Sequence, residues 1–190
     1  MKLTNTKNQV IIGKVVNIEE ETLVIADERE TFELPVKKET YERLEKCSIK
    51  EGTTLLVYVS EGEVTSFMFN GRQRFIATLP KKDNPSETYN TELNVFIGRA
   101  AKISDGEKNV QVSLPVQRKD STDWYNLNFW RDEENDLASK ALLELSPGED
   151  GKKVLFWAVT GAPSKFKNKD GKERTSYSVR EFATYEYVGK

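Results

Sequence analysis

The residues of this chain that could do chemistry are cations and large aromatic rings, and they gather in its second half. The stretch SKFKNKDGKER, residues 164–174, carries five cations against two acids and encloses Phe166. Upstream, DWYNLNFWR at residues 123–131 holds Trp124 and Trp130. Cations neutralise polyanions and flat rings stack on other flat rings, so these residue types favour binding over bond cleavage. A basic stretch on its own is also typical of a solvated hairpin tip.

The residues that most enzymes need are scarce. The chain has no histidine, which removes the commonest general base and metal ligand, and its single Cys47 cannot build a thiolate zinc site. Neither a GxxxxGK[ST] phosphate loop nor a GxGxxG turn is present. The acids of RDEENDLASK, residues 131–140, are typical of a helix start, where the helix dipole favours negative charge. We therefore expect a protein that is not an enzyme and needs no cofactor.

Composition indicates a globular protein with a strongly hydrated surface. The 190 residues are 37% apolar and 32% charged, with a net charge of −2. That length suits one large domain or two small ones, and that charge requires any polyanion site to be a local patch. A single cysteine fits a reducing compartment, no apolar run approaches the ~18 residues of a membrane span, and MKLTNTKNQV lacks the apolar core of a secretory signal. A cytoplasmic protein without membrane association is the simplest interpretation.

A polar segment divides the chain into two parts. LPKKDNPSETYNTE contains two prolines and no hydrophobic period, so residues 79–93 are predicted to be a linker. It separates an N-terminal domain at 1–78 from a C-terminal domain at 94–190. The residues up to 93 carry a net charge of −3 and the rest carry +1. The second part is therefore the better candidate for binding a polyanion.

Two short matches suggest that the parts share an architecture. VIIGKVVNI at residues 10–18 aligns with VFIGRAAKI at 95–103, and EGTTLLVYVSEG at 51–62 aligns with DGKKVLFWAVTG at 150–161.

Hydrophobic patterns predict strands near 9–18, 21–26, 30–35, 53–60 and 63–70, with a helix in 37–47. In the second part they predict strands near 94–103, 109–118, 123–131, 152–161 and 174–186, with a helix near 134–145. Each part thus reads β-β-β-α-β-β, the element order of the OB-fold. We expect a mainly β protein of two tandem five-stranded OB-like Greek-key barrels, each with one helix between strands three and four. Another small five-stranded barrel is the alternative.

Side-chain alternation along 123–131 predicts two different faces. One face receives Tyr125, Leu127 and Phe129, which suits a core. The other receives the two tryptophans and two amides: Trp124, Asn126, Asn128 and Trp130. Large rings left on a polar face usually touch a partner. In an OB-fold this face and the loop that contains 164–174 hold oligonucleotides.

Single-stranded nucleic acid fits this face, because unpaired bases stack on aromatic rings, amides hydrogen-bond base edges and cations neutralise phosphates. The stacking candidates are Trp124, Trp130 and Phe166, and the amides are Asn126 and Asn128. The candidate phosphate contacts are Arg118, Lys119, Arg131, Lys165, Lys167, Lys169, Lys172 and Arg174. Two alternatives stay open: the tryptophans cover a protein–protein or subunit interface, or the ligand is single-stranded RNA.

The C-terminal part resembles the bacterial and phage single-stranded DNA-binding protein family over roughly residues 94–188. The matching pieces are NVFIGRAAKI, VQVSLPVQR, TDWYNLNFW, LASKALLEL, GKKVLFWAVTG and KFKNKDGKERTSYSV. The resemblance implies stacking by Trp124, Trp130 and Phe166, and a basic hairpin that includes Lys165, Lys167 and Arg174. It also implies sequence-independent binding of single-stranded DNA in replication, recombination or DNA transfer.

The sequence departs from that family in three places. The loop QRKDSTDW is short and holds no aromatic residue before Trp124, and the chain stops at TYEYVGK without an acidic tail. Recruitment of replication or recombination proteins through such a tail is therefore in doubt. The additional N-terminal part is acidic and has no tryptophan, although FMFNGRQRF at 67–75 leaves room for a secondary contact. We expect that part to serve oligomerisation or partner binding, and a homodimer is a guess by analogy.

Overall fold

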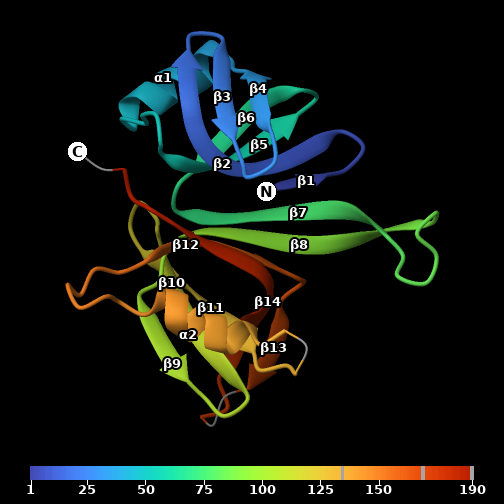
Figure 1. Cartoon of the computed structure of the whole chain (residues 1–190), viewed down its shortest axis with the longest axis vertical. Helices are drawn as coiled ribbons and strands as arrows, with labels where there is room; N and C mark the ends of the chain where they lie inside the picture. The colour runs from blue at the N-terminus through green and yellow to red at the C-terminus, as the bar shows by residue number, and fades with distance from the viewer. Residues whose placement is uncertain (134, 168–169, 189–190) are drawn as a thin grey trace. The chain divides into compact units, whose positions relative to one another are not determined.

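The computed structural model describes residues 1–133, 135–167 and 170–188, which form two compact units (Figure 1). The first unit comprises Met1–Phe69, Ile76–Asn90 and residues 187–188. The second comprises Asn70–Phe75 and the described residues of Thr91–Glu186. Each unit has its own hydrophobic core.

The first unit is a twisted antiparallel sheet with one helix. Its elements are β1 (Lys2–Thr4), β2 (Asn8–Glu19), β3 (Thr22–Ala26), β4 (Thr31–Pro35), α1 (Lys38–Lys46), β5 (Thr54–Ser60) and β6 (Glu63–Met68). The strands pair in the order β4-β3-β2-β5-β6, with β1 on β2. Alternate residues such as Leu23 and Ile25 point into the core, and α1 adds Leu44. An isolated parallel bridge joins Val36 to Val64 of β6.

The second unit is built on a longer sheet. Its elements are β7 (Gly71–Pro80), β8 (Thr88–Arg99), β9 (Lys102–Asp105), β10 (Asn109–Gln117), β11 (Thr122–Trp130), α2 (Leu137–Leu145), β12 (Leu155–Thr160), β13 (Ser164–Lys167) and β14 (Glu173–Tyr185), although 76–80 and 88–90 are grouped with the first unit. The order is β7-β8-β12-β14-β11-β10-β9, with β13 on β14. Apolar residues of β8, β10, β11, β12 and β14 meet α2 in the core, where the rings of Phe129 and Phe182 lie edge to face with centroids 5.0 Å apart.

The predicted elements are found in both parts of the chain, together with the further strands β1, β7, β9 and β13. Three strands, a helix and two strands follow one another as β2-β3-β4-α1-β5-β6, and again as β8, β10, β11, α2, β12 and β14. The protein is mainly β, and its two sheets are consistent with an OB-like fold. Along the strand orders of the described residues, neither sheet closes into a barrel, so tandem closed barrels stay a prediction.

The sequence pattern did not predict four strands, and one of them changes how the segment 79–93 is understood. Strands β1, β7 and β13 are not predicted, β9 is predicted only as the end of the strand at 94–103, and 79–93 contains the end of β7 and the start of β8. Backbone hydrogen bonds hold a hairpin together without burial, so its exposed residues 88–90 show no hydrophobic period. The domain boundaries at 78 and 94 stay predictions, while residues 70–75 group with the second unit.

The glycine shared by the two aligned repeats has a steric role in each copy. Gly13 lies in β2, where an added Cβ would stand 2.4 Å from the carbonyl oxygen of Ala26. Gly98 lies in β8, where it would stand 2.7 Å from Nδ2 of Asn70. The strands that carry them pair with equivalent partners, β2 with β5 and β8 with β12. The two glycines thus lie in strands with equivalent partners, although their registers differ by two residues, with Gly13 opposite Leu55 and Gly98 opposite Phe156.

Asp136, one of the acids before α2, lies at the helix start, and it gives a prediction about stability in acid; Glu134 lies outside the described residues. Asp136 is the N-cap, and its carboxylate accepts a hydrogen bond of 3.0 Å from the backbone N–H of Ser139. Hydrogen bonds from the hydroxyl and backbone N–H of Ser139 lower the pKa of Asp136 below its usual value. A carboxyl group whose pKa is lower in the folded state than in the unfolded state stabilises the fold at pH values above its unfolded pKa of about 4. This stabilisation is lost as the pH falls towards the folded pKa.

We expect Asp136→Ala to lower the urea midpoint of the second unit at neutral pH, because the cap is lost. Asp136→Asn keeps a capping oxygen, so it is expected to unfold close to wild type at neutral pH. The difference in urea midpoint between the wild type and Asp136→Ala should become smaller from pH 5 to pH 3. Asp136→Asn has no carboxylate to protonate at this position, so its cap should not weaken over that range. Urea unfolding followed by tryptophan fluorescence at both pH values checks this, since all three tryptophans lie beyond residue 120. A gap that is constant with pH would contradict the role of the charge.

Candidate functional site

Strand β11 separates a buried face from an exposed one as the sequence predicts. Leu127 and Phe129 are fully buried, and Tyr125 packs against the same core. On the other side Trp124 is 59% exposed and Trp130 is 45% exposed. At a rise of about 3.4 Å per residue, the two rings are anchored roughly 20 Å apart along the strand. That spacing leaves room for several bases between them.

A row of polar side chains connects the two tryptophans on that exposed face. Oδ1 of Asn128 accepts hydrogen bonds from Nδ2 of Asn109 at 3.0 Å and from Nε2 of Gln111 at 3.1 Å. Oδ1 of Asn126 accepts one from the Ser113 hydroxyl at 3.2 Å. These are cross-strand neighbours in the β10–β11 register. Asn128, predicted to be an open amide, is only 6% exposed, and its oxygen already accepts two hydrogen bonds, so little of it is available to a base.

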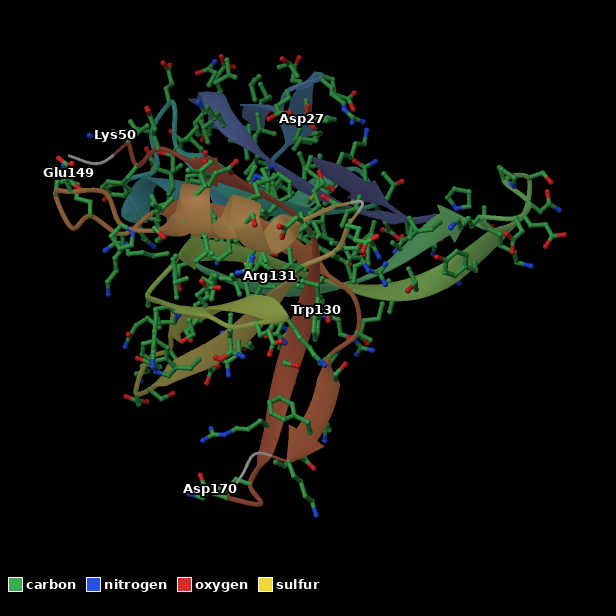
Figure 2. The ribbon with its side chains drawn as sticks, turned by 60° about the horizontal axis from the view of Figure 1, so that its bottom comes forward. Asp27, Lys50, Trp130, Arg131, Glu149 and Asp170 are labelled. Atoms are coloured by element: carbon green, nitrogen blue, oxygen red, sulfur yellow. The ribbon has the colours of Figure 1, made fainter. Side chains whose placement is uncertain are left out.

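Ser178 is a member of this face that sequence reasoning did not single out. Its Oγ accepts a hydrogen bond of 3.1 Å from the indole Nε1 of Trp130. Strand β14 runs parallel to β11 here, with Ser178 opposite Asn128. Tyr177 and Val179 on either side are buried, so the alternation along 177–179 was the available signal. The bond fixes how the Trp130 ring lies on the face (Figure 2).

The basic stretch forms a hairpin whose two sides differ. Phe166 of β13 lies opposite Arg174 of β14, while Lys165 lies opposite Thr175 and Lys167 opposite Glu173. Figure 2 shows the two strands running together from the neighbourhood of Trp130 to a tip at Asp170. A regular alternation would put Arg174 on the side of Ser178 and Trp130, although Ser176 and Tyr177 between them are both buried. Phe166 is 45% exposed on that same side.

Two lysines of the hairpin do not lie on the same side as Phe166 and Arg174. Lys165 and Lys167 point to the other side, and Nζ of Lys165 lies 3.1 Å from the Glu173 carboxylate. Lys172 is exposed beside the start of β14, and Lys169 lies outside the described residues. Over its described residues, the stretch is thus a hairpin with Phe166 and Arg174 on one side and Lys165 and Lys167 on the other.

Two of the other predicted phosphate contacts already have acidic partners. Nε of Arg118 lies 2.9 Å from Asp123, and hydrogen bonds to Asp123 and Tyr125 raise the pKa of Arg118. A nitrogen of Arg131 lies 2.6 Å from the carboxylate of Asp105. Lys119 is exposed in the turn between β10 and β11. Ion pairing reduces the charge that Arg118 and Arg131 offer to a phosphate.

A cluster of aromatic rings lies where β11 and β14 begin to diverge. Phe96, Tyr125 and Tyr177 pack with ring centroids between 4.9 and 6.0 Å apart. Tyr177 is 3% exposed, and burial raises its pKa, while the charge of Arg72 opposes that shift. A guanidinium nitrogen of Arg72 donates a hydrogen bond of 2.6 Å to the Tyr177 hydroxyl. Residues 70–75, expected in the N-terminal part, therefore contribute to the second unit.

No helix among the residues that the structure describes is long and apolar enough to cross a membrane.

Comparison with known proteins gives little beyond this geometry. No family model matches the sequence, and no curated protein matches it. Among solved structures, the chain is similar to the mitochondrial single-stranded DNA-binding protein Rim1 of S. cerevisiae, with 18% sequence identity, 50% of this chain and 96% of that chain covered, and a TM-score of 0.35. The assignment of a function to this chain therefore rests on the geometry of its own side chains.

Proposed function

We propose that this chain binds single-stranded DNA with little sequence preference and without catalysing a reaction. The observation that carries the proposal is the pair of exposed tryptophans on the polar face of β11, 59% and 45% exposed. Aromatic side chains on such a face stack on unpaired bases at roughly 1–3 kcal/mol per base. The process that such binding would serve is replication, recombination or DNA transfer.

The proposed binding face consists of the outward sides of β10, β11 and β14 with the β13–β14 hairpin. Trp124, Trp130 and Phe166 supply rings, and Arg174 supplies a cation beside Phe166. Asn126 offers its amide N–H groups to base edges, because its oxygen accepts from Ser113. Lys165, Lys167, Lys119, Lys172, Arg118 and Arg131 supply further charge at the periphery, with the paired residues contributing less.

We also propose that each part of the chain is a five-stranded OB-like barrel. In the first unit, the support is the Val36–Val64 bridge, which brings the end of β4 beside β6. In the second, β8 pairs with β12 while β9, its continuation past residue 101, pairs with β10. Together β8 and β9 act as one bent first strand that meets both the second and the fourth strand, as an OB-fold requires.

A titration of the full chain with a thymidine oligonucleotide tests the proposed function. We expect strong quenching of tryptophan fluorescence at low salt, because bases stack on Trp124 and Trp130. The apparent affinity should fall as salt rises, because phosphate contacts release counterions. The same titration with a uridine oligonucleotide measures the preference for DNA over RNA. Absence of quenching and of binding at low salt would contradict the proposal and leave the tryptophans as a protein interface, which sedimentation would then reveal as self-association.

A further inference from the structure

The segment 70–75 is attached to the second unit close to Trp124. Nδ2 of Asn70 donates a hydrogen bond of 3.2 Å to the backbone carbonyl of Pro115. Pro115 of β10 is the register partner of Trp124 in β11. Strand β7 then continues along β8 as the end of the sheet. The residues that follow Asn70 are thus held near the end of the β10–β11 pair that carries Trp124, on the side of Tyr125.

Arg72, two residues further along, is held in a fixed position. One guanidinium nitrogen donates a hydrogen bond of 2.6 Å to the Tyr177 hydroxyl. The guanidinium carbon lies 5.6 Å from the ring centroids of both Tyr125 and Tyr177. A guanidinium has five N–H donors, and this hydrogen bond uses one of them. The side chain is half-buried, so it retains contact with solvent. The remaining donors are available to a ligand.

The charge of Arg72 has no acidic partner among the described residues, since no ion pair there includes it. Its neighbours differ in this respect. Arg74 on the same side of β7 lies 2.8 Å from Glu92, and Arg118 lies 2.9 Å from Asp123. Glu92, the partner of Arg74, also acts on the Tyr177 hydroxyl, so Arg72 is a positive charge oriented by the tyrosine rings near a carboxylate with which it makes no ion pair.

The register between β11 and β14 begins after Trp124 and Tyr125, and the Tyr125 ring packs there on Phe96 and Tyr177. β14 pairs with β11 at Leu127 and Asn128, beyond the positions of Trp124 and Tyr125. Trp124 points to the binding face and Tyr125 to the side where Arg72 lies. A nucleic-acid strand with a base on Trp124 would have to turn around the end of β11 to bring its backbone to Arg72.

We propose that Arg72 binds a backbone phosphate of the single strand at the Trp124 end, so that β7 extends the binding surface beyond the second part of the chain. This inference rests on the proposed function. Phosphate oxygens match the planar fork of a guanidinium, and burial of the stem against rings reduces the entropy lost on binding. The ligand chemistry is a phosphodiester, and the contact carries no base specificity.

The test measures the salt dependence of oligonucleotide binding by anisotropy of a labelled thymidine oligonucleotide. One phosphate contact to a single strand contributes about 0.7 to the slope of log affinity against log salt. Arg72→Gln should reduce the magnitude of the slope by about that amount and weaken binding several-fold at low salt. Arg74→Gln, on the same strand but paired with Glu92, is the matched control and should change the slope far less. Arg72→Lys keeps the charge and should retain most of the slope.

Tyr177→Phe separates a direct contact from a structural role, because it removes the hydroxyl but keeps the cation. We expect it to leave the slope of the wild type unchanged. Weaker binding by Arg72→Gln with an unchanged slope would overturn the inference and assign Arg72 a structural role. Equal loss of slope in Arg72→Gln and Arg74→Gln would also overturn it. Failure of the wild type to bind at any salt contradicts the proposed function itself, and is seen before any variant is compared.

Discussion

Replacing Trp124 and Trp130 together by alanine is expected to weaken oligonucleotide binding by about 2–6 kcal/mol, on the order of 30-fold to 10,000-fold in dissociation constant. Each ring offers one stacking surface on the exposed face of β11. The salt dependence should stay close to that of the wild type, because the phosphate contacts remain. Anisotropy of a labelled thymidine oligonucleotide is the suitable measurement, since the substitution removes the fluorescent reporters.

The control for this pair is Leu143→Ala on α2, which removes an 83% exposed apolar side chain away from the proposed face. We expect it to leave binding unchanged. Both variants should unfold near the wild-type temperature, because exposed rings contribute little to the core. Full binding by the double tryptophan variant would contradict the stacking proposal. Loss of self-association in that variant, with no change in binding, would instead support a subunit interface.

The faces of β11 could be predicted from sequence because alternation is a local property of a strand. Phe129 and its neighbour Trp130 are adjacent in sequence but opposite in exposure, as a period of two requires. The same logic holds for Tyr177 and Ser178 on β14. Local hydrophobic patterns thus locate most of the strands, both helices and the exposed tryptophans.

The partners of these side chains were not predictable, because they come from distant parts of the chain. Arg72 reaches Tyr177 across 105 residues, and Asn70 reaches Pro115 across 45. The sequence gives the type of each side chain but not the register that pairs it. Arg118 and Arg131 were expected to be available cations, yet each lies beside an aspartate. Asn128 was expected on an open face, yet cross-strand amides enclose it.

The segment 70–75 illustrates a second limit of pattern reasoning. Its aromatic and basic residues were noticed, but the polar sequence that follows favoured a domain boundary after it. Strand β7 is held by backbone pairing with β8 and by the hydrogen bonds of Asn70 and Arg72. None of these interactions produces a hydrophobic period in the sequence. A boundary inferred from composition therefore falls inside a hairpin.

The strongest effect on stability is expected from Phe129→Ala, the neighbour of Trp130. Phe129 is fully buried and packs edge to face on Phe182 at 5.0 Å, so its removal leaves a cavity in the core of the second unit. Such substitutions cost about 3–5 kcal/mol of unfolding free energy. Denaturant unfolding followed by tryptophan fluorescence should show the loss, since the reporters lie in that half of the chain.

Trp130→Ala, at the next position of the strand, is the matched comparison. It should reduce binding much more than it reduces stability. Its side chain is 45% exposed and its indole N–H bonds Ser178, so we expect a stability loss well below that of Phe129→Ala. Binding should fall instead, by about 1–3 kcal/mol for one lost stacking contact. The comparison is decisive because two consecutive residues of one strand are predicted to divide stability from binding. Equal losses of stability in both variants would mean that Trp130 belongs to the core, and the proposed face would then lack one of its two stacking rings.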